Sequence, residues 1–301
     1  METIILGRKP RKTAPSNRAK LLRHYNEAGM DYRTWSRDFN MHFGYYKPGM
    51  NPLDRRKMLE QMNMEVLQTL GLQGATGLCI LDLGCGLGAT ARTGAKSFPG
   101  NNFHGITLVD WQVQKGRELI NKQGLSEAVT LQRADYTATP FPNGYADATY
   151  AIESACHDSS PNKECFIQEM SRLLKPDGRF AIADAFLKTP EAQFHPLLYK
   201  AYNKICDHWA VPGMAQINRF EKLLRKYDLT DICIKEISLN IAPSVLHAPA
   251  LVIWFLIKNL LKGKLPGPTT LQHLEACLLS PLMGLARKNF GYFIITGKKL
   301  H

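Results

Sequence analysis

The segment Leu81-Asp82-Leu83-Gly84-Cys85-Gly86-Leu87-Gly88 decides the fold of this chain. It closes a β-rich run at residues 78–83, and a helix is expected to begin near Ala89. Its three glycines allow a tight turn and let the backbone come close to a ligand. The dinucleotide fingerprint GxGxxG has its third glycine later, and the carboxylate of Asp82 would repel a pyrophosphate. The segment therefore predicts a strand–loop–helix unit that binds a different nucleotide-like ligand.

Strand and helix signals alternate after this loop. Short β-rich runs are separated by helix-length segments, which predicts parallel strands joined by right-handed crossovers. Two further runs near the C-terminal end bring the expected sheet to seven strands, in an α/β, Rossmann-like, doubly wound architecture. The expected strands are 78–83, 102–108, 129–133, 146–152, 178–185, 231–239 and 290–297.

The pattern predicts one folded domain behind a basic leader that is expected to be flexible. A helical lid precedes the cofactor-binding core, and two helical insertions follow strands. Because α/β sheets bind ligands at the carboxyl ends of their strands, we expect these insertions to form a cap over the substrate pocket. The expected boundaries are 1–23 for the leader, 24–299 for the domain, 24–75 for the lid, 76–186 for the core, and 187–230 and 241–289 for the cap.

The chain has 301 residues, 45% of them hydrophobic, so it can bury one sizeable core but hardly two full domains. Its net charge of +12 lies at the two ends. Residues 8–23 hold seven basic side chains and no acid, residues 246–301 hold seven against one, and residues 24–245 balance to zero. No RRM, KH or helix-turn-helix pattern accompanies this charge, so we expect no nucleic-acid partner. A solubilising tail, an anionic substrate or a membrane surface would each explain it.

The cysteines and apolar runs bear on the cellular compartment. Seven cysteines form no CxxC and no zinc-like cluster with histidine, which is typical of reduced thiols, and no metal site is expected. The longest uncharged apolar run near the C-terminal end, 248–257, has about half the length that spanning a bilayer needs. We therefore expect a cytoplasmic protein without a transmembrane segment, with peripheral membrane contact as an open alternative.

The glycine loop resembles motif I of class I S-adenosylmethionine (SAM) methyltransferases. The resemblance implies that the loop wraps the methionine part of SAM and that Asp82 helps to hold its ammonium group. Asp135, followed by Tyr136, matches the family's acid that accepts a hydrogen bond from the adenine amino group. The run Lys175-Pro176-Asp177-Gly178 matches the family's LKPGG turn before the fifth strand. The implied cofactor is SAM.

The second expected strand departs from the family pattern. Most class I enzymes end it with an acid that binds both ribose hydroxyls, but Gly105-Ile106-Thr107-Leu108 has none. Asp110 could substitute after a shift in register. The GITL…Q form, with Gln112, is similar to that of the tocopherol, sterol and cyclopropane fatty-acid branch, in which the Thr and Gln positions serve the ribose. We favour Gln112 over Asp110.

Upstream residues indicate the same branch. Tyr25-Asn26 and His42-Phe43-Gly44-Tyr45-Tyr46 resemble the YD…HxGYY lid of tocopherol and sterol methyltransferases. That resemblance implies that aromatic residues close over the sulfonium cation by cation–π attraction and exclude water. Packing alone would also explain any single tyrosine. The implied cofactor-binding residues are Tyr25, Tyr45, Asp82, Gly84, Gly86, Gly88, Thr107, Gln112, Asp135 and Tyr136.

Residues 150–158, Tyr-Ala-Ile-Glu-Ser-Ala-Cys-His-Asp, follow the fourth expected strand. They resemble the IEATCH stretch of sterol C24-methyltransferases. Methylation of an alkene or an electron-rich ring creates a cation, and a carboxylate can both stabilise that charge and accept the proton that leaves. Glu153 is the candidate for this catalytic role, with His157 as a second base or relay. The structural alternatives are a helix N-terminal acid for Glu153 and a polar pocket wall for His157.

The sequence thus predicts a SAM-dependent methyltransferase that acts at carbon on a lipophilic, isoprenoid-derived small molecule. An anionic head group on that substrate, or an anionic membrane, would suit the basic residues of the expected cap. One alternative is an N-methyltransferase of an alkaloid or another amine, and a second is a non-catalytic SAM- or lipid-binding protein. The oligomeric state is not predicted. The basic cap residues are Lys258, Lys262, Lys264, Arg287 and Lys288.

Overall fold

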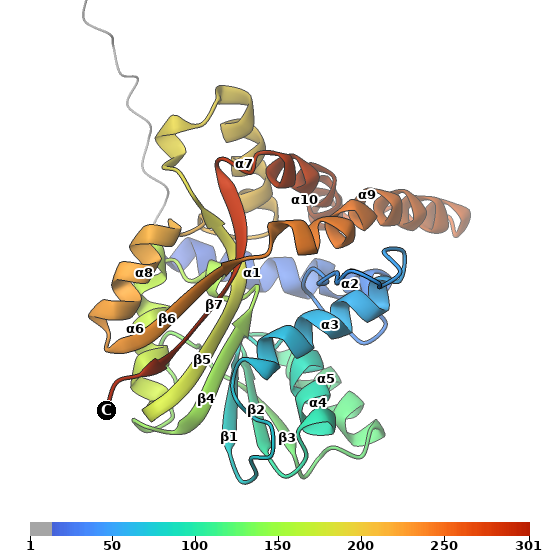
Figure 1. Cartoon of the computed structure of the whole chain (residues 1–301). Coiled ribbons are helices and arrows are strands. Elements are labelled where there is room, and N and C mark those ends of the chain that lie inside the picture. Colours follow the sequence, from blue (N-terminus) through green and yellow to red (C-terminus); the bar gives the residue numbers. More distant parts are fainter. Residues whose placement is uncertain (1–13) are drawn as a thin grey trace, which may run out of the picture.

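The computed structural model describes residues 14–301 and contains a seven-stranded sheet in the order β3-β2-β1-β4-β5-β7-β6 (Figure 1). The first five strands run parallel, and β7 lies antiparallel between β5 and β6. The predicted seven-stranded, doubly wound α/β fold is therefore confirmed, with the last strand reversed. The strands are β1 Cys79–Leu83, β2 Asn102–Thr107, β3 Val129–Arg133, β4 Ala146–Ile152, β5 Leu174–Leu187, β6 Leu229–Glu236 and β7 Phe290–Lys299.

Helices cover both faces of the sheet because its central strands are apolar on both sides (Figure 1). On one face, Ile80 of β1 belongs to a core cluster with residues of α3, α4 and α5. On the other face, Leu81 and Leu83 pack with residues of α6 and α8. These helices are α3 Arg55–Gln68, α4 Ala89–Ser97, α5 Asp110–Lys122, α6 Glu164–Leu173 and α8 Ile217–Lys226.

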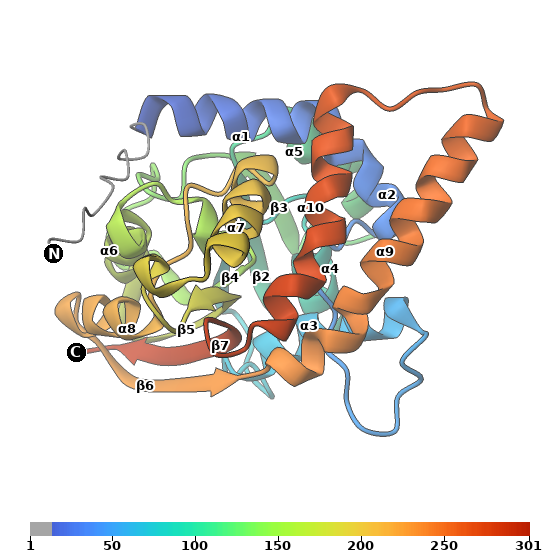
Figure 2. The ribbon, with the colours of Figure 1, turned by 90° about the horizontal axis from the view of Figure 1, so that it is seen from above.

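A further layer of helices forms a cap beyond the carboxyl ends of the parallel strands (Figure 2). Within it, α10 contacts α1, α7 and α9. Of the predicted insertion 187–230, only α7 belongs to this layer, because α8 packs against α6 and β6. The cap helices are α1 Ala14–Ala28, α2 Tyr32–Trp35, α7 Pro196–His208, α9 Ser238–Leu261 and α10 Pro268–Leu285. Short 3-10 turns lie at Gly29–Asp31, Ala155–His157, Pro161–Lys163 and Glu191–Gln193.

Some element boundaries differ from the expected ones. Helix α1 begins at Ala14, so residues 14–23 of the predicted leader are helical. Residues 1–13, the rest of that leader, lie outside the described part of the chain. Helix α9 begins at Ser238, inside the strand predicted to run to residue 239, because the pairing of β6 with β7 ends at Glu236.

Helix α9 is long and apolar. By length and composition alone, it is the one helix in residues 14–301 that could cross a membrane. The uncharged apolar run 248–257 is only part of this helix, which extends from Ser238 to Leu261. Its first half is fixed in the protein, since Ile241 and Val245 are buried and Ser244 Oγ accepts a hydrogen bond from the Gly44 N–H at 2.7 Å.

Candidate active site

The glycine loop joins β1 to α4 in a conformation that requires glycine. Gly84 and Cys85 both donate their N–H groups to the carbonyl oxygen of Ile106, at 3.0 and 2.9 Å. Gly84 has a φ of +93°, and a Cβ atom there would lie 2.4 Å from Cβ of Ser154. Any side chain would therefore be strained and would collide. The bare backbone lets the loop curve around a cavity.

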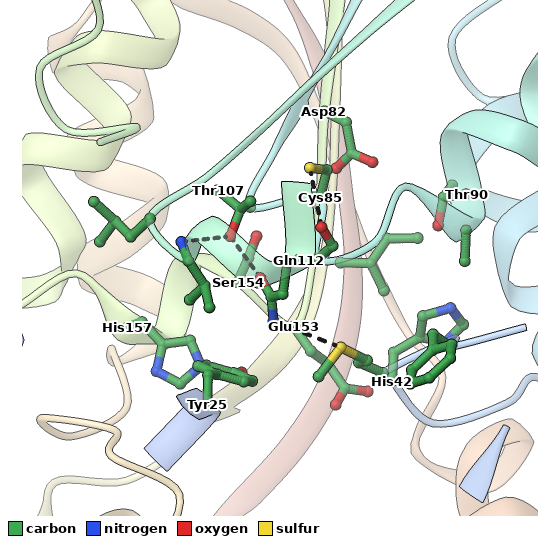
Figure 3. Close-up of a pocket in the computed structure, with 18 of the residues that line it drawn as sticks. Tyr25, His42, Asp82, Cys85, Thr90, Thr107, Gln112, Glu153, Ser154 and His157 are labelled. Carbon is green, nitrogen blue, oxygen red and sulfur yellow. Dashed lines mark hydrogen bonds between the residues drawn. The ribbon is translucent and has the colours of Figure 1, made fainter. Parts of the chain in front are cut away.

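That cavity encloses about 760 Å³, counting the part that is open to solvent (Figure 3). The carboxyl ends of β1, β2 and β4 form its floor, and α1 and residues 39–42 form its roof. Three of the predicted cofactor-binding residues, Tyr45, Gly88 and Asp135, are not among its lining residues. The other seven predicted residues line it: Tyr25, Asp82, Gly84, Gly86, Thr107, Gln112 and Tyr136.

Asp82 supplies a buried carboxylate to this cavity. The side chain is 4% exposed, and its Oδ2 atom accepts a hydrogen bond from the Tyr150 hydroxyl at 2.9 Å. Burial raises the pKa of Asp82 to about 7, and the hydrogen bond from Tyr150 acts to lower it. A cationic group bound beside it would favour the ionised form. Asp82 can therefore hold an ammonium group.

The end of β2 presents an amide rather than an acid. Gln112, on the first turn of α5, is buried, and its Oε1 atom accepts a hydrogen bond from the Thr107 hydroxyl at 2.6 Å (Figure 3). The alternative residue, Asp110, forms an ion pair with Arg133 at 3.2 Å, and its side chain is 63% exposed. Of the two, only Gln112 lines the cavity.

Tyr136 and Asp135 follow β3, and only the side chain of Tyr136 lines the cavity. The Tyr136 hydroxyl donates to the carbonyl oxygen of Ser154 at 2.8 Å, and the ring lines the cavity. The Asp135 carboxylate accepts hydrogen bonds from Arg18 of α1 at 3.1 Å and from the Thr137 hydroxyl at 2.7 Å. Asp135 thus ties α1 to the core at the edge of the cavity.

The predicted lid residues take separate places. Tyr25 lines the cavity, and its hydroxyl lies 3.2 Å from Nε2 of His157. His42 is buried and contacts the Asn63 side chain at 2.9 Å. Tyr45 instead packs in the core beneath α3, where its N–H donates to the carbonyl oxygen of Met58. The lid is thus a folded segment that contacts the site through Tyr25 and His42.

A second, larger cavity adjoins the first and encloses about 1170 Å³, again counting the part open to solvent. Its walls come from α1, α2, α9, α10, residues 41–43 and the segment 209–214 that follows α7. They are mainly apolar, with Trp35, Phe43, Trp209, Val252 and Phe255 among them. The two cavities meet at a shared wall. The residues that line both are Tyr25, Met41, His42, Glu153 and His157.

Glu153 stands at this junction, directly after β4. Its Oε1 atom accepts hydrogen bonds from the Phe43 N–H at 2.7 Å and from the Tyr292 hydroxyl at 2.9 Å. No partner within residues 14–301 donates to Oε2. Burial raises the pKa of Glu153 to about 8, and the nearby Asp184 carboxylate adds to the rise. The residue also has a φ of +48°, a strained value that aims its side chain at the junction.

His157, the second predicted catalytic residue, lies in the 3-10 turn after Glu153. Its Nδ1 atom is 3.3 Å from the carbonyl oxygen of Ala210, and its Nε2 atom faces the Tyr25 hydroxyl. Burial lowers the pKa of His157 to about 4, so the ring is neutral near pH 7. Both ring nitrogens therefore have partners in the protein. This arrangement suits a polar residue of the pocket wall, which was the structural alternative for His157.

A profile of the methyltransferase domain family matches residues 80–178, the segment that holds the glycine loop and Glu153. A rice (Oryza sativa subsp. japonica) protein assigned as a chloroplastic tocopherol O-methyltransferase is 30% identical over 212 residues, which cover 68% of this chain. A sterol 24-C-methyltransferase of Yarrowia lipolytica is 32% identical over 164 residues, or 54% of this chain. Residues 80–178 therefore form a methyltransferase domain of the class I, SAM-dependent type.

This chain spans only part of the length of these relatives, 58% of the rice protein and 41% of the yeast protein. A solved structure covers it more completely. Geranyl diphosphate C-methyltransferase from Streptomyces coelicolor A3(2) superposes with a TM-score of 0.69, covering 97% of this chain and 100% of that one. At 17% sequence identity, this likeness shows that the two share a fold.

The first cavity fits SAM, the cofactor of this family. At Gly84 the loop has no room for a Cβ atom, so its bare backbone borders the cavity. Asp82 offers a buried carboxylate for an ammonium group. Gln112 and Thr107 offer polar atoms at the end of β2, where a ribose would lie. Glu153 and His42 then border the side on which the second cavity opens.

Two further residues at the junction of the methyltransferase were not predicted. Asp184, at the end of β5, is 3% exposed, lines the second cavity, and accepts hydrogen bonds from the Cys156 and Ala185 N–H groups. Burial raises its pKa to about 6. Asp184 lies near the C-terminal end of a predicted strand, and this position could have indicated a site residue. Tyr292 lies on β7, and nothing in the sequence indicated that β7 is reversed and borders β5.

The five basic residues singled out from the sequence lie elsewhere. All are exposed, and none lines either cavity. Within the described residues, the second cavity has no Lys or Arg in its wall, whereas it has the carboxylates of Asp31, Glu153 and Asp184. These basic residues are Lys258, Lys262, Lys264, Arg287 and Lys288.

Proposed function

We propose that this protein transfers the methyl group of SAM to a carbon atom of an uncharged, lipophilic, isoprenoid-derived small molecule. One observation carries the proposal: Glu153 lies where the cofactor cavity meets an apolar cavity, and its Oε2 atom is without a protein partner among the described residues. SAM, when bound, supplies an electrophilic methyl group on a sulfonium. The chain supplies the base, the alignment and the dry surroundings.

Alignment comes from the shape of the site. The acceptor must approach the methyl carbon on the side opposite sulfur, so the two ligands need adjoining cavities with a common opening. Tyr25, Met41 and His42 frame that opening together with Glu153. The aromatic and aliphatic walls of the second cavity exclude water, which strengthens the electrostatic effect of the carboxylate.

The carboxylate of Glu153 acts after the methyl group moves. Transfer of the methyl group from a bound SAM to the acceptor carbon would leave neutral S-adenosylhomocysteine and a positive charge on the acceptor. Glu153 stabilises this cation and then accepts the proton that the acceptor loses, which leaves a neutral methylated product. The Phe43 N–H and the Tyr292 hydroxyl hold Oε1, so Oε2 is the atom free to take the proton.

The walls of the second cavity favour an uncharged acceptor. A diphosphate needs basic side chains or a metal ion to balance its charge. Lys and Arg are absent from the described wall, and the described residues contain no group of three or more His, Cys, Asp or Glu that could hold a metal. The wall also holds three carboxyl groups, each of which repels an anion when it is ionised. Prenylated phenols and sterols fit these properties better than prenyl diphosphates do.

The test is a transfer assay with methyl-labelled SAM and four acceptors: a prenylated phenol, a sterol, a lipophilic amine, and geranyl diphosphate with Mg²⁺. We expect label in one of the two neutral acceptors, attached to carbon in the product. Glu153→Gln should lower kcat by about 10²–10³-fold, whereas SAM affinity should fall far less. Glu60→Gln, an exposed acid on α3, is the matched control.

Other outcomes separate the alternatives. Label in the amine, together with near-normal activity of Glu153→Gln, would assign N-methylation, because an amine needs no stabiliser of a carbocation. Label in geranyl diphosphate alone would overturn the neutral-acceptor part of the proposal. SAM binding without transfer to any of the four acceptors or to a lipophilic extract would indicate a non-catalytic binding protein.

A further inference from the structure

The end of α9 and the turn that follows it form an exposed apolar surface that the active site does not use. We call residues 253–265 the cap tip. Trp254 is 58% exposed, and the leucines at its far end are more exposed still, up to 88% at Leu265. The same helix lines the second cavity through Leu251 and Val252, which precede the cap tip, and through Phe255 within it. The exposed apolar members of the cap tip are Ile253, Trp254, Leu256, Ile257, Leu260, Leu261 and Leu265.

Positive charge surrounds this apolar surface. Lys258, Lys262 and Lys264 lie within the cap tip, are exposed, and have no ion-pair partner among the described residues. No acid occurs between residues 238 and 274, and the next one, Glu275, pairs with Lys204. A tryptophan, exposed aliphatic side chains and unpaired lysines on one short helical segment are typical of a surface that inserts into the interface of an anionic membrane.

From this combination we propose that the cap tip docks on an anionic lipid membrane. The apolar side chains would enter the boundary between head groups and acyl chains, and the lysines would contact lipid phosphates. Because the same helix walls the second cavity, docking places that cavity next to the phase in which lipophilic acceptors dissolve. The inference needs only the surface and its charge, so it holds whichever acceptor the enzyme uses.

The helix lies on the membrane and does not cross it. Its first half is held in the protein, with Ser244 fully buried and Ala248 and Val252 nearly so. Only residues 253–261 project as helix, and nine residues rise by roughly 14 Å, about half of a hydrocarbon core of about 30 Å. Both views in Figures 1 and 2 show this end of α9 projecting beyond the body of the protein.

A second copy of the chain would suit this surface less well. In a two-fold symmetric dimer, the same patch of each copy meets at the interface. The cap tip would then bring Lys258, Lys262 and Lys264 of both copies together, and the cap tip itself contains no acid to neutralise them. An anionic membrane supplies that missing negative charge.

The test is flotation of the full-length protein with phosphatidylcholine vesicles, with and without phosphatidylglycerol. We expect binding to the anionic vesicles, weakened by high salt, and a blue shift of fluorescence that Trp254→Phe removes. Ile257→Ser/Leu261→Ser and Lys258→Glu/Lys262→Glu should each lower the bound fraction at least 10-fold. The matched controls, which should float as wild type does, are Leu300→Ser, a 54% exposed leucine at the other end of the protein, and Lys96→Glu/Lys122→Glu.

Unchanged SAM affinity and an unchanged melting temperature show that each variant is folded. Failure of the wild-type protein to float, or equal flotation of the cap-tip variants, would overturn the proposal. Since the basic residues before Ala14 are intact in all variants, binding through them would appear as such equal flotation. A concentration-dependent dimer that Ile257→Ser/Leu261→Ser dissociates, without vesicle binding, would instead assign the surface to self-association.

Discussion

The hydroxyl of Tyr292 donates a hydrogen bond to Oε1 of Glu153 at 2.9 Å, and so links the last strand of the sheet to the end of β4. A donor to the carboxylate favours its ionised form and partly offsets the effect of burial on the pKa of Glu153. Tyr292 is therefore a positioning residue that also keeps the proposed base available near neutral pH.

Tyr292→Phe should shift the pH dependence of methyl transfer to higher pH. Glu153 must be ionised to accept a proton, so the rate should rise as pH increases through its pKa, which is about 8 before the cofactor binds. The cationic sulfonium lowers that pKa when SAM is bound, and loss of the Tyr292 hydroxyl raises it. The measurement is kcat/KM for the acceptor against pH at saturating SAM. Identical profiles for wild type and variant would contradict the assignment.

Glu153→Gln should stabilise the fold, and more so at high pH. The ordinary pKa of this group, 4.5, rises to about 8 in the folded protein. Between these values the folded state keeps a proton that the unfolded state has lost, so wild-type stability falls as pH rises through about 8. Glutamine keeps the acceptor for Phe43 without the charge. We expect a gain of about 1–3 kcal/mol above pH ~8 and a smaller gain near pH ~5, measured by denaturant unfolding.

Asp82→Ala should weaken SAM binding about 10- to 100-fold, because the carboxylate faces the cavity that fits the cofactor's ammonium group. The pKa of Asp82 is about 7, so wild-type affinity should improve as pH rises through that value. Titration calorimetry on either side of pH ~7 measures both effects. Unchanged affinity of the variant would refute the assignment of the glycine loop.

Gln112→Ala and Asp110→Ala should behave differently. Gln112 is buried against Thr107 in the cavity wall, whereas Asp110 faces solvent and pairs with Arg133. We expect roughly a 10-fold loss of SAM affinity for Gln112→Ala and almost none for Asp110→Ala. The reverse order in titration calorimetry would assign the ribose to Asp110.

Gly84→Ala should abolish SAM binding and destabilise the fold by about 1–3 kcal/mol. The added methyl group would meet Ser154 at 2.4 Å in a backbone conformation that alanine rarely adopts. Gly124→Ala is the matched control, since its φ is also positive, at +67°, and nothing lies within 4 Å of the new atom. That variant should bind SAM normally. A comparable loss of binding in both variants would show that strain elsewhere, not the loop, matters.

The parts of the site that the sequence predicts are those encoded within a few residues. Positive φ angles at a strand end require glycines, which makes the loop at 84–88 recognisable. Glu153 follows its strand directly, so the position of the strand places the residue at the ligand-binding edge. Gln112 and Thr107 are five residues apart and meet through one turn of backbone.

The parts that it misses depend on contacts between distant segments. Tyr292 reaches Glu153 only because β7 runs antiparallel beside β5, with Tyr292 opposite Ala185. No local pattern encodes that reversal. Helix α8 was predicted to belong to the cap, yet Phe220 and Leu224 bury it on the sheet, since either surface suits an amphipathic helix of that length. Asp135 accepts a hydrogen bond from Arg18, a partner 117 residues away.

The connection between β6 and β7 begins and ends at one point in the molecule. Glu236 is paired with Phe293, and the Ile237 N–H donates to the carbonyl oxygen of Tyr292 at 2.7 Å. A short hairpin turn would therefore be enough to join β6 to β7. Helices α9 and α10 together form an insertion between these two strands. The length and sequence of this insertion can therefore change without disturbing the strands and the glycine loop that form the cofactor cavity. The proposed acceptor cavity and the proposed membrane contact can then change together, because α9 contributes residues to both.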